Sequence, residues 1–509
     1  MPYKYGVYGN IADSVAQSAS TADTVAVYVG TAPVNLVRGY DKAGVVNAPV
    51  KVSDYLTAQK KLGLSKDWGK FTLCEAIEAH FNNTLGNIGD VFFINVLNPA
   101  THRKAEETKK ELVFQNGAVK FLSDTIILDT LKIKIDDADS SSDDSDSGDA
   151  TETKTYLNEG EDYTVDYDFT KGAVIISGAD LTGTYTAEFY EIDTANIDET
   201  DIIGGVTAGG VYSGLGCVKL LYQNENRVVN LIGAPGWSHI PTVYRAMISA
   251  ATKVNGHWEA FVAADIPTTD EADGVDTIDA AIKWKKEKAY NNERSVVCFP
   301  KAIDGDGRVF HISTLRIVEY MRTDATHDGV PFETAGNKQV DVIGQYFGKS
   351  STNKGFDQET ANNLTQNGIC TVSFWGGVWN LWGDHTAAYA YGADSVDPRA
   401  IFDCTIRMLF HCVNGFQRRN GVKIDMPFTL RMKDQILDSE QEILDGYKEA
   451  GAFIGEPKIL FLETDNSTSE MMNGNFQFRL PVTVTPPMHS ATVNVYYTDE
   501  GFSSYFEEA

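Results

Sequence analysis

The residues of this chain that most resemble catalytic ones are an acid and an imidazole side by side, Asp384 and His385, followed by Thr386. Such groups can perform general acid–base or nucleophilic catalysis. Neighbouring residues, however, point to opposite faces of a strand and lie about 100° apart on a helix, so they are badly placed to act on one another. Nearby tryptophans, the last of them Trp382, suit a core or an interface. We therefore predict that the pair serves packing and hydrogen bonding.

Two glycine-rich stretches also invite a chemical interpretation. Residues 204–216, GGVTAGGVYSGLG, lack both the GxGxxG spacing and the Lys-Ser/Thr of a phosphate loop, so we predict a flexible connector. Residues 304–308, DGDGR, begin like a calcium loop, but the following residues supply no acidic ligand, and we predict a tight turn. No GxSxG or HExxH motif occurs. The sequence predicts no catalytic, cofactor-binding or metal site, and a protein that is not an enzyme.

The cysteines point to a reducing compartment. None has CxxC spacing and most sit in apolar runs, so buried reduced thiols are expected, with disulfides or a metal site as the alternatives. They are Cys74, Cys217, Cys298, Cys370, Cys404 and Cys412. No apolar run is long enough to span a membrane, and the first ten residues do not resemble a secretory signal. We expect the protein to stay in the compartment where it is made.

The charge is strongly acidic and unevenly distributed. The chain of 509 residues carries a formal net charge of −28, which argues against nucleic acid as a partner. Residues 136–201 hold 20 acidic side chains against Lys154 and Lys171, a local net of −18. Within them, DDADSSSDDSDSGDATET lacks hydrophobic residues and the spacing of a calcium loop, so a mobile solvated loop is predicted. One segment is therefore an acidic module, and the rest is nearly balanced.

Periodicity predicts a chain of mixed α/β and α+β domains. A strand at 24–30, a helix at 73–83 with Leu73, Ile77 and Phe81 on one face, and a buried strand at 90–98 open the fold. His80 lies beside that apolar stripe and is predicted to be a partly buried structural histidine. Strands at 228–235, 259–267 and 295–302 then alternate with helices at 241–254, 275–291 and 309–322. That alternation predicts a mainly parallel sheet in a three-layer domain.

The remaining segments differ in character. Short strands without a helical period predict an all-β sandwich or barrel inserted at 109–197. Residues 369–488 read as a mixed α+β domain whose helix over 429–451 ends at the cap Gly451. The predicted division is 1–22 for an N-terminal strand arm and linker, 23–108 and 198–368 for the α/β domain, 109–197 for the insertion, 369–488 for the C-terminal domain, and 489–509 for a C-terminal strand arm.

Both ends of the chain predict lone strands. Residues 3–9 alternate as Tyr3, Tyr5 and Val7 ahead of a small polar linker, and residues 491–499 place Val493, Val495 and Tyr497 on one face. A single strand is unstable in water, so each must pair with a partner. Pairing within its own domain is one possibility, and addition to the sheet of a neighbouring copy is the other.

The C-terminal half resembles contractile tail sheath proteins of myophage-like tails and contractile bacteriocins. Trp382, Gly383 and Thr386 match the Trp-Gly-x-x-Thr signature of that family, with His385 where relatives usually carry Arg. VDPRAIFDCTIRMLFH and a helix ending in GAFIGEP follow in the order of the family. Further matches are VAVYVGTAPVN, NAPVKVSDYLTAQKKLG, DVFFINVLNP and GVPFETAGNKQV. The resemblance covers most of the chain except the acidic β insertion.

The resemblance implies a structural polymer. Sheath subunits form hexameric rings stacked helically around an inner tail tube, and their terminal arms add strands to neighbours. The implied partners are further copies of the chain, the tube protein, and baseplate and tail terminator proteins, with no nucleic acid and no membrane insertion. Assembly is expected in the host bacterial cytoplasm, before incorporation into the tail. The alternatives are a cytoplasmic α/β enzyme that binds a small molecule and a surface or adhesion protein that uses the β insertion.

Overall fold

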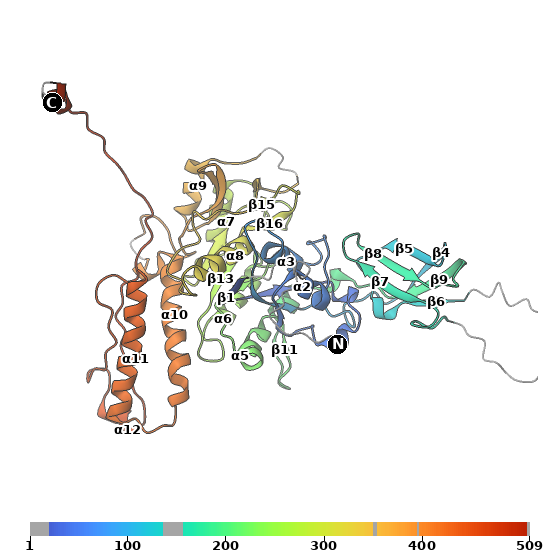
Figure 1. The fold of residues 1–509 in the computed structure, drawn as a ribbon, viewed down its shortest axis with the longest axis horizontal. Helices are drawn as coiled ribbons and strands as arrows, with labels where there is room; N and C mark the ends of the chain where they lie inside the picture. The colour runs from blue at the N-terminus through green and yellow to red at the C-terminus, as the bar shows by residue number, and fades with distance from the viewer. Residues whose placement is uncertain (1–19, 136–155, 350–353, 394–395, 506–509) are drawn as a thin grey trace, which may run out of the picture.

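The computed structural model describes residues 20–135, 156–349, 354–393 and 396–505. Figure 1 shows a central body of helices and strands with an all-β lobe on one side and two long helices, α10 and α11, on the opposite side. Beyond these helices the C-terminal segment extends away from the body. The prediction of a mixed α/β chain with several structural units is confirmed.

The body is built around a six-stranded sheet. Its order is β14 (Ser295–Cys298), β13 (Phe261–Asp265), β12 (Leu231–Gly233), β1 (Ser20–Gly30), β3 (Ile88–Asn95) and β2 (Val50–Val52). All neighbours pair in parallel except β2, which runs antiparallel to β3. Strands β3, β12, β13 and β14 are buried along nearly their whole length, which explains their continuous apolar runs.

Helices cover both faces of this sheet. Helices α3 (Leu73–Phe81) and α8 (Ile312–Ala325) pack on one another and on β1, whereas α6 (Pro241–Ala251) packs on β12 and β13. Right-handed crossovers that run outward from β1 in opposite directions place α3 and α6 on opposite faces. The smaller helices of the body are α1 (Tyr40–Ala43), α2 (Tyr55–Leu62), α4 (Glu199–Ile203), α5 (Leu220–Glu225), α7 (Ile278–Glu287) and α9 (Gln358–Thr365).

Two boundary predictions were wrong. The helix expected over 309–322 begins only at Ile312, because residues 309–311 form strand β16 (Val309–His311). This strand pairs with β15 (Lys301–Ile303), which also pairs with β17 (Gly344–Tyr346). Residues 20–22, assigned to the N-terminal linker, belong to β1, where Ser20 and Thr21 are in register with Ile88 and Gly89.

The glycine-rich stretch after α4 is an ordered hairpin, not a flexible connector. Strand β10 (Gly205–Val206) pairs with β11 (Tyr212–Ser213) in antiparallel register. Gly204 has φ +52°, and a Cβ there would lie 2.1 Å from the carbonyl oxygen of Ser213. The glycine is therefore required by close backbone approach. The predicted tight turn at 304–308 is confirmed, since the Asp304 carboxylate accepts from the amides of Asp306 and Arg308.

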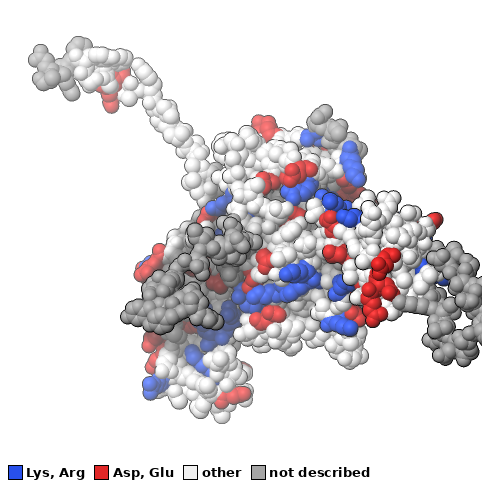
Figure 2. Space-filling model, turned by 45° about the vertical axis from the view of Figure 1, so that its right-hand side comes forward, with Lys and Arg blue, Asp and Glu red and all other residues white. Residues whose placement is uncertain are grey.

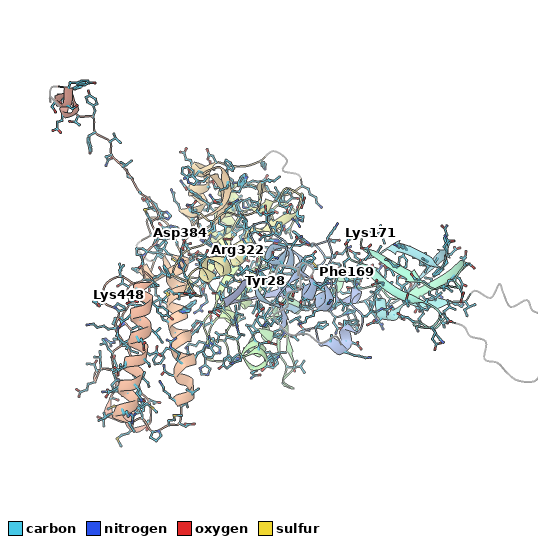
Figure 3. All side chains as sticks on the ribbon, in the orientation of Figure 1. Tyr28, Phe169, Lys171, Arg322, Asp384 and Lys448 are labelled. Carbon is cyan, nitrogen blue, oxygen red and sulfur yellow. The ribbon has the colours of Figure 1, made fainter. Side chains whose placement is uncertain are left out.

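The β lobe consists of two three-stranded antiparallel sheets. One has the order β4 (Thr108–Phe114), β9 (Gly183–Phe189) and β6 (Lys132–Lys134), and the other β5 (Ala118–Leu122), β8 (Ala173–Ser177) and β7 (Thr164–Asp168). Buried side chains from both sheets, including Phe114 and Ile176, share one small core. Phe169 packs against this core and against the core of the body, at the junction labelled in Figure 3. The predicted acidic loop at 136–153 lies outside the described residues.

The predicted burial of the cysteines is confirmed, because all six are free and buried. His80 is a structural histidine, as expected, but it is completely buried. Its Nδ1 lies 3.1 Å from the carbonyl oxygen of Ile88, to which it must donate, and its Nε2 accepts from the Tyr28 hydroxyl at 2.9 Å. The ring is therefore neutral, and burial lowers its pKa to about 3.

We expect His80 to make the body sensitive to acid. Its folded-state pKa lies below the unfolded value of 6.5, so its contribution is complete above pH 6.5 and is lost as the pH falls towards 3. Between pH 6.5 and pH 5 this one ring should remove about 2 kcal/mol of unfolding free energy. Urea titrations at the two pH values, on the parent and on His80→Gln, measure that difference. The exposed His257→Gln serves as control and should keep the full acid sensitivity, whereas an unchanged slope in His80→Gln would contradict the assignment.

The C-terminal part contains an antiparallel helix pair. Helices α10 (Asp403–Asn420) and α11 (Leu430–Glu449) pack through a core that includes Met408 and Leu444. The predicted cap at Gly451 is confirmed by its φ of +89°. Residues 456–463 and 476–486 form extended segments, and the second of them makes isolated bridges from Arg479 to Leu460 and from Val484 to Phe453. Helix α12 (Thr468–Met472) connects them.

The predicted C-terminal strand is not paired within the described residues. Tyr3, Tyr5 and Val7 of the predicted N-terminal arm lie outside the described residues. Residues 490–499 of the predicted C-terminal arm form no strand, and a short 3-10 helix (Glu500–Tyr505) follows them. None of the helices within the described ranges has the length and apolar character required to cross a membrane.

Candidate assembly interface

The signature residues Trp382, Gly383 and Thr386 lie at a structural corner between the body and α10. Trp382 ends β19 (Val378–Trp382), which pairs with β18 (Thr371–Trp375). Gly383 has φ +101°, and a Cβ there would lie 2.9 Å from Cγ2 of Thr365, so only glycine fits without strain. The Thr386 hydroxyl donates to the carbonyl of Ala400 in the segment that leads into α10. The motif therefore positions α10 against the body.

A buried ion pair continues this connection. The Arg316 guanidinium of α8 donates to the Asp403 carboxylate at the start of α10, and both side chains are completely buried. The Tyr320 hydroxyl donates to the same oxygen at 2.5 Å. One turn further along α10, Arg407 pairs with Asp324, whose carboxylate also accepts from the Thr24 hydroxyl at 2.6 Å. These contacts hold α10 on α8 and on β1.

The far end of the helix pair exposes apolar side chains. The loop from α10 to α11, the first residue of α11 and the neighbouring α12 carry a group of exposed hydrophobic residues, here called the tip patch. The tip patch consists of Val422, Ile424, Met426, Leu430 and Met472. Figure 1 places this end of α10 and α11 away from the body. Apolar surface gathered in this way is typical of a contact with another protein.

The C-terminal arm, residues 490–505, is the second exposed apolar element. Val493, Val495 and Tyr497 are each more than four-fifths exposed. Between Ser490 and Thr498 the arm has no charged residue, and Figure 2 shows it as an almost uncharged projection from a body on which both signs are mixed. Its backbone and side chains are thus available to a partner.

An open strand edge lies close to the root of that arm. The segment 476–485 packs Phe478, Leu480 and Val482 against the core of the helix pair. The backbone amides of these three residues have no hydrogen-bond partner within the described parts of the chain. Unpaired edge amides of this kind are a template for strand addition.

The body contains a large cavity where an enzyme of this topology would bind its ligand. It measures about 1080 Å³ and is lined by residues that follow the carboxyl ends of the strands, among them Trp237 and Lys301. Several of its charged side chains pair with one another: His311 Nδ1 lies 2.6 Å from the Glu75 carboxylate, and Lys301 pairs with Glu271. Burial opposes a charge on His311, but the Glu75 carboxylate raises its pKa overall. The arrangement therefore has the form of an internal ion-pair network.

Asp384 and His385 are not hydrogen-bonded to each other. His385 Nδ1 lies 3.9 Å from Asp384 Oδ1, beyond hydrogen-bond range, and 3.1 Å from the carbonyl of Ile401. The residue that sequence reasoning missed is His489, whose Nδ1 donates to the Asp384 carboxylate at 3.1 Å. It lies 105 positions away in the chain, and no local motif announces the contact.

Sequence comparison finds a relative of this chain among phage tail proteins. A tail sheath protein of Burkholderia phage BcepMu is 24% identical over 502 residues, a match that covers 94% of this chain and 96% of the phage protein. No family model matches the chain.

Two solved assemblies contain chains of the same fold. A chain of the anti-feeding prophage baseplate has a TM-score of 0.54 at 11% identity and covers 98% of this chain, and all of that chain is matched. A chain of the sheath complex of an extracellular contractile injection system, solved in the contracted state, has a TM-score of 0.53 at 11% identity and covers 98% of this chain and 99% of its own length. The sequence match along nearly the whole of both chains identifies the protein as a homologue of a phage tail sheath protein, and the two assemblies contain chains of the same fold.

Proposed function

We propose that the protein is the structural subunit of a contractile tail sheath. Copies assemble as hexameric rings stacked helically around an inner tail tube, and contraction of the sheath drives the tube through a bacterial envelope. The near full-length match to a phage tail sheath protein supports this function. The other partners we propose are baseplate and tail terminator proteins, with assembly in the host bacterial cytoplasm.

The observation that carries the proposal is the combination of a free strand and a free edge in one chain. The C-terminal arm presents Val493, Val495 and Tyr497 to solvent, and the segment 476–485 presents unpaired amides. In Figure 1 the arm projects from the body and does not lie along its own edge, and in this proposal it pairs with the edge of a neighbouring copy. Head-to-tail pairing of this kind generates rings and open helices, not closed dimers. Tyr3, Tyr5 and Val7 make the corresponding N-terminal strand in this proposal.

We infer the orientation of the subunit from the helix pair and the β lobe, which lie on opposite sides of the body. We assign the tip patch and the helix pair α10–α11 to the side that faces the tube or an adjacent subunit in the inner wall. The β lobe lies on the opposite side of the body (Figure 1), so it faces outward. In this proposal the acidic sequence of residues 136–201, with a net charge of −18, discourages clumping of filaments. The domain division at 108/109, 197/198, 368/369 and 488/489 is part of this proposal.

Electron microscopy of the purified protein tests the proposal. We expect negative-stain images at rising protein concentration to show stacked rings or tubes of uniform diameter, because each added copy offers another free edge. Uniform small particles at every concentration would instead favour an enzyme, with the 1080 Å³ cavity as its ligand site. A melting temperature that rises with a small-molecule ligand would support that alternative.

A further inference from the structure

Three metal-ligating side chains converge where the C-terminal arm leaves the body. His489 Nδ1 lies 3.1 Å and 3.2 Å from the two carboxylate oxygens of Asp384. The rings of His385 and His489 are 4.8 Å apart between centroids. One carboxylate oxygen and one nitrogen of each imidazole all lie within 4.8 Å of one another. Figure 3 labels Asp384 at the base of the projecting arm.

The chemistry of this donor set selects the class of ion. Two imidazole nitrogens and one carboxylate oxygen suit borderline divalent transition metals, Zn²⁺ above all, whereas Ca²⁺ and Mg²⁺ prefer oxygen ligands alone. Two ligands of a tetrahedral Zn²⁺ ion with bonds of about 2.0 Å stand about 3.3 Å apart. Asp384 and His489 already have nearly this separation, and three protein ligands leave a fourth position for water.

The ring of His385 is held in place by the residues around it, with its Nδ1 at 3.9 Å from Asp384 Oδ1. Its Nδ1 donates to the Ile401 carbonyl at 3.1 Å, which leaves the lone pair of the neutral ring on Nε2. The ring stacks on Tyr389 with centroids 3.5 Å apart and on Phe402 with centroids 5.3 Å apart. Both Asp384 and His385 are buried, whereas the His489 side chain is half exposed and leaves an entry path for the ion.

We propose that Asp384, His385 and His489 form a binding site for a Zn²⁺-like divalent metal ion that fastens the root of the C-terminal arm to the body. His489 is the last described residue of the chain with a hydrogen bond or ion pair to the body. A metal ion there joins the arm to a corner already fixed by Gly383 and Thr386, so it sets the direction in which the arm leaves. The site itself does not depend on the sheath function.

Metal binding to the unassembled full-length chain tests the proposal. After treatment with a chelator and dialysis, we expect the parent to bind one Zn²⁺ ion per chain at this site and to give a visible absorption band with Co²⁺. His489→Gln and Asp384→Asn should each weaken Zn²⁺ binding at least about tenfold and abolish the Co²⁺ band. His327→Gln is the matched control, because His327 also pairs with a carboxylate, that of Glu333 at 2.5 Å, but has no third ligand beside it in the described structure.

The result that overturns the proposal is equal Zn²⁺ affinity and an equal Co²⁺ band in the parent and in His489→Gln. Absence of both signals in the parent would overturn it too. His489 is half exposed, so its substitution should leave the metal-free melting temperature unchanged. Proteolysis of residues 490–500 gives a second readout: Zn²⁺ should slow cleavage in the parent and not in His489→Gln. Because the subunits are unassembled, a negative result here leaves the sheath proposal standing, and a failure to polymerise leaves the metal site standing.

Discussion

Removing residues 491–509 is expected to give a protein that folds normally but no longer forms tubes. The described arm residues beyond His489 make no hydrogen bond or ion pair with the body, so their loss should not change the melting temperature. Assembly should be abolished, because the strand that Val493, Val495 and Tyr497 would add to a neighbour is gone. Negative-stain images and sedimentation velocity of the truncated and complete chains measure the outcome.

Two point substitutions sharpen this prediction. Val495→Asp places a charge on the face shared by Val493 and Tyr497, and it should prevent tubes at concentrations where the parent forms them. Asn494→Asp adds the same charge to the opposite face of the strand and should leave assembly intact. Tubes that persist after the truncation, or that respond equally to both substitutions, would contradict strand addition by this arm.

Asp403→Ala is expected to cost about 3–5 kcal/mol of unfolding free energy, because it leaves Arg316 charged and buried without a counter-ion. The Asp403 carboxylate accepts from the Arg316 guanidinium and from the Tyr320 hydroxyl, and both charged side chains are completely buried. Urea unfolding followed by circular dichroism measures the loss. Asp438→Ala, an exposed position on α11, should change stability by less than about 0.5 kcal/mol.

The double variant Arg316→Met/Asp403→Leu separates pairing from packing. Replacing both partners with apolar residues of similar size removes the uncompensated charge, so most of the lost stability should return. A cost below about 1 kcal/mol for Asp403→Ala alone would mean that Arg316 finds another partner or reaches solvent. In either case the ion pair between α8 and α10 would not be one of the contacts that hold the helix pair on the body.

Periodicity was sufficient for the elements whose burial is local. The stripe of Leu73, Ile77 and Phe81 predicted α3, and the apolar run around Phe92 predicted β3. It failed where an element depends on a distant partner. Residues 309–311 continue into the helical pattern of α8, and only pairing with β15 makes them a strand. The sequence around Ser20 and Thr21 likewise predicts a linker, and only their pairing with Ile88 and Gly89 makes them part of a strand.

The same limit applies to the candidate sites. The sequence was enough to predict that Asp384 and His385 would not act on each other, because adjacent side chains diverge. The sequence did not predict that His489 would contact Asp384. That contact arises because α11 and the extended segment 476–485 bring the chain back to the body. The prediction for the glycine-rich stretch at 204–216 was wrong for a related reason. Its glycines are required by close backbone contacts, such as the one between Gly204 and Ser213, and these depend on the fold.

The absence of charge along the arm has a consequence for the response of the polymer to ionic strength. The surface of the body carries charges of both signs, and dissolved salt at 0.1 M screens interactions between such exposed charges beyond about 10 Å. The stretch from Ser490 to Thr498 has no charge to screen, and apolar burial is not weakened by salt. In the proposed polymer, high salt is therefore expected to weaken the contacts between neighbouring bodies while the arms keep the subunits joined.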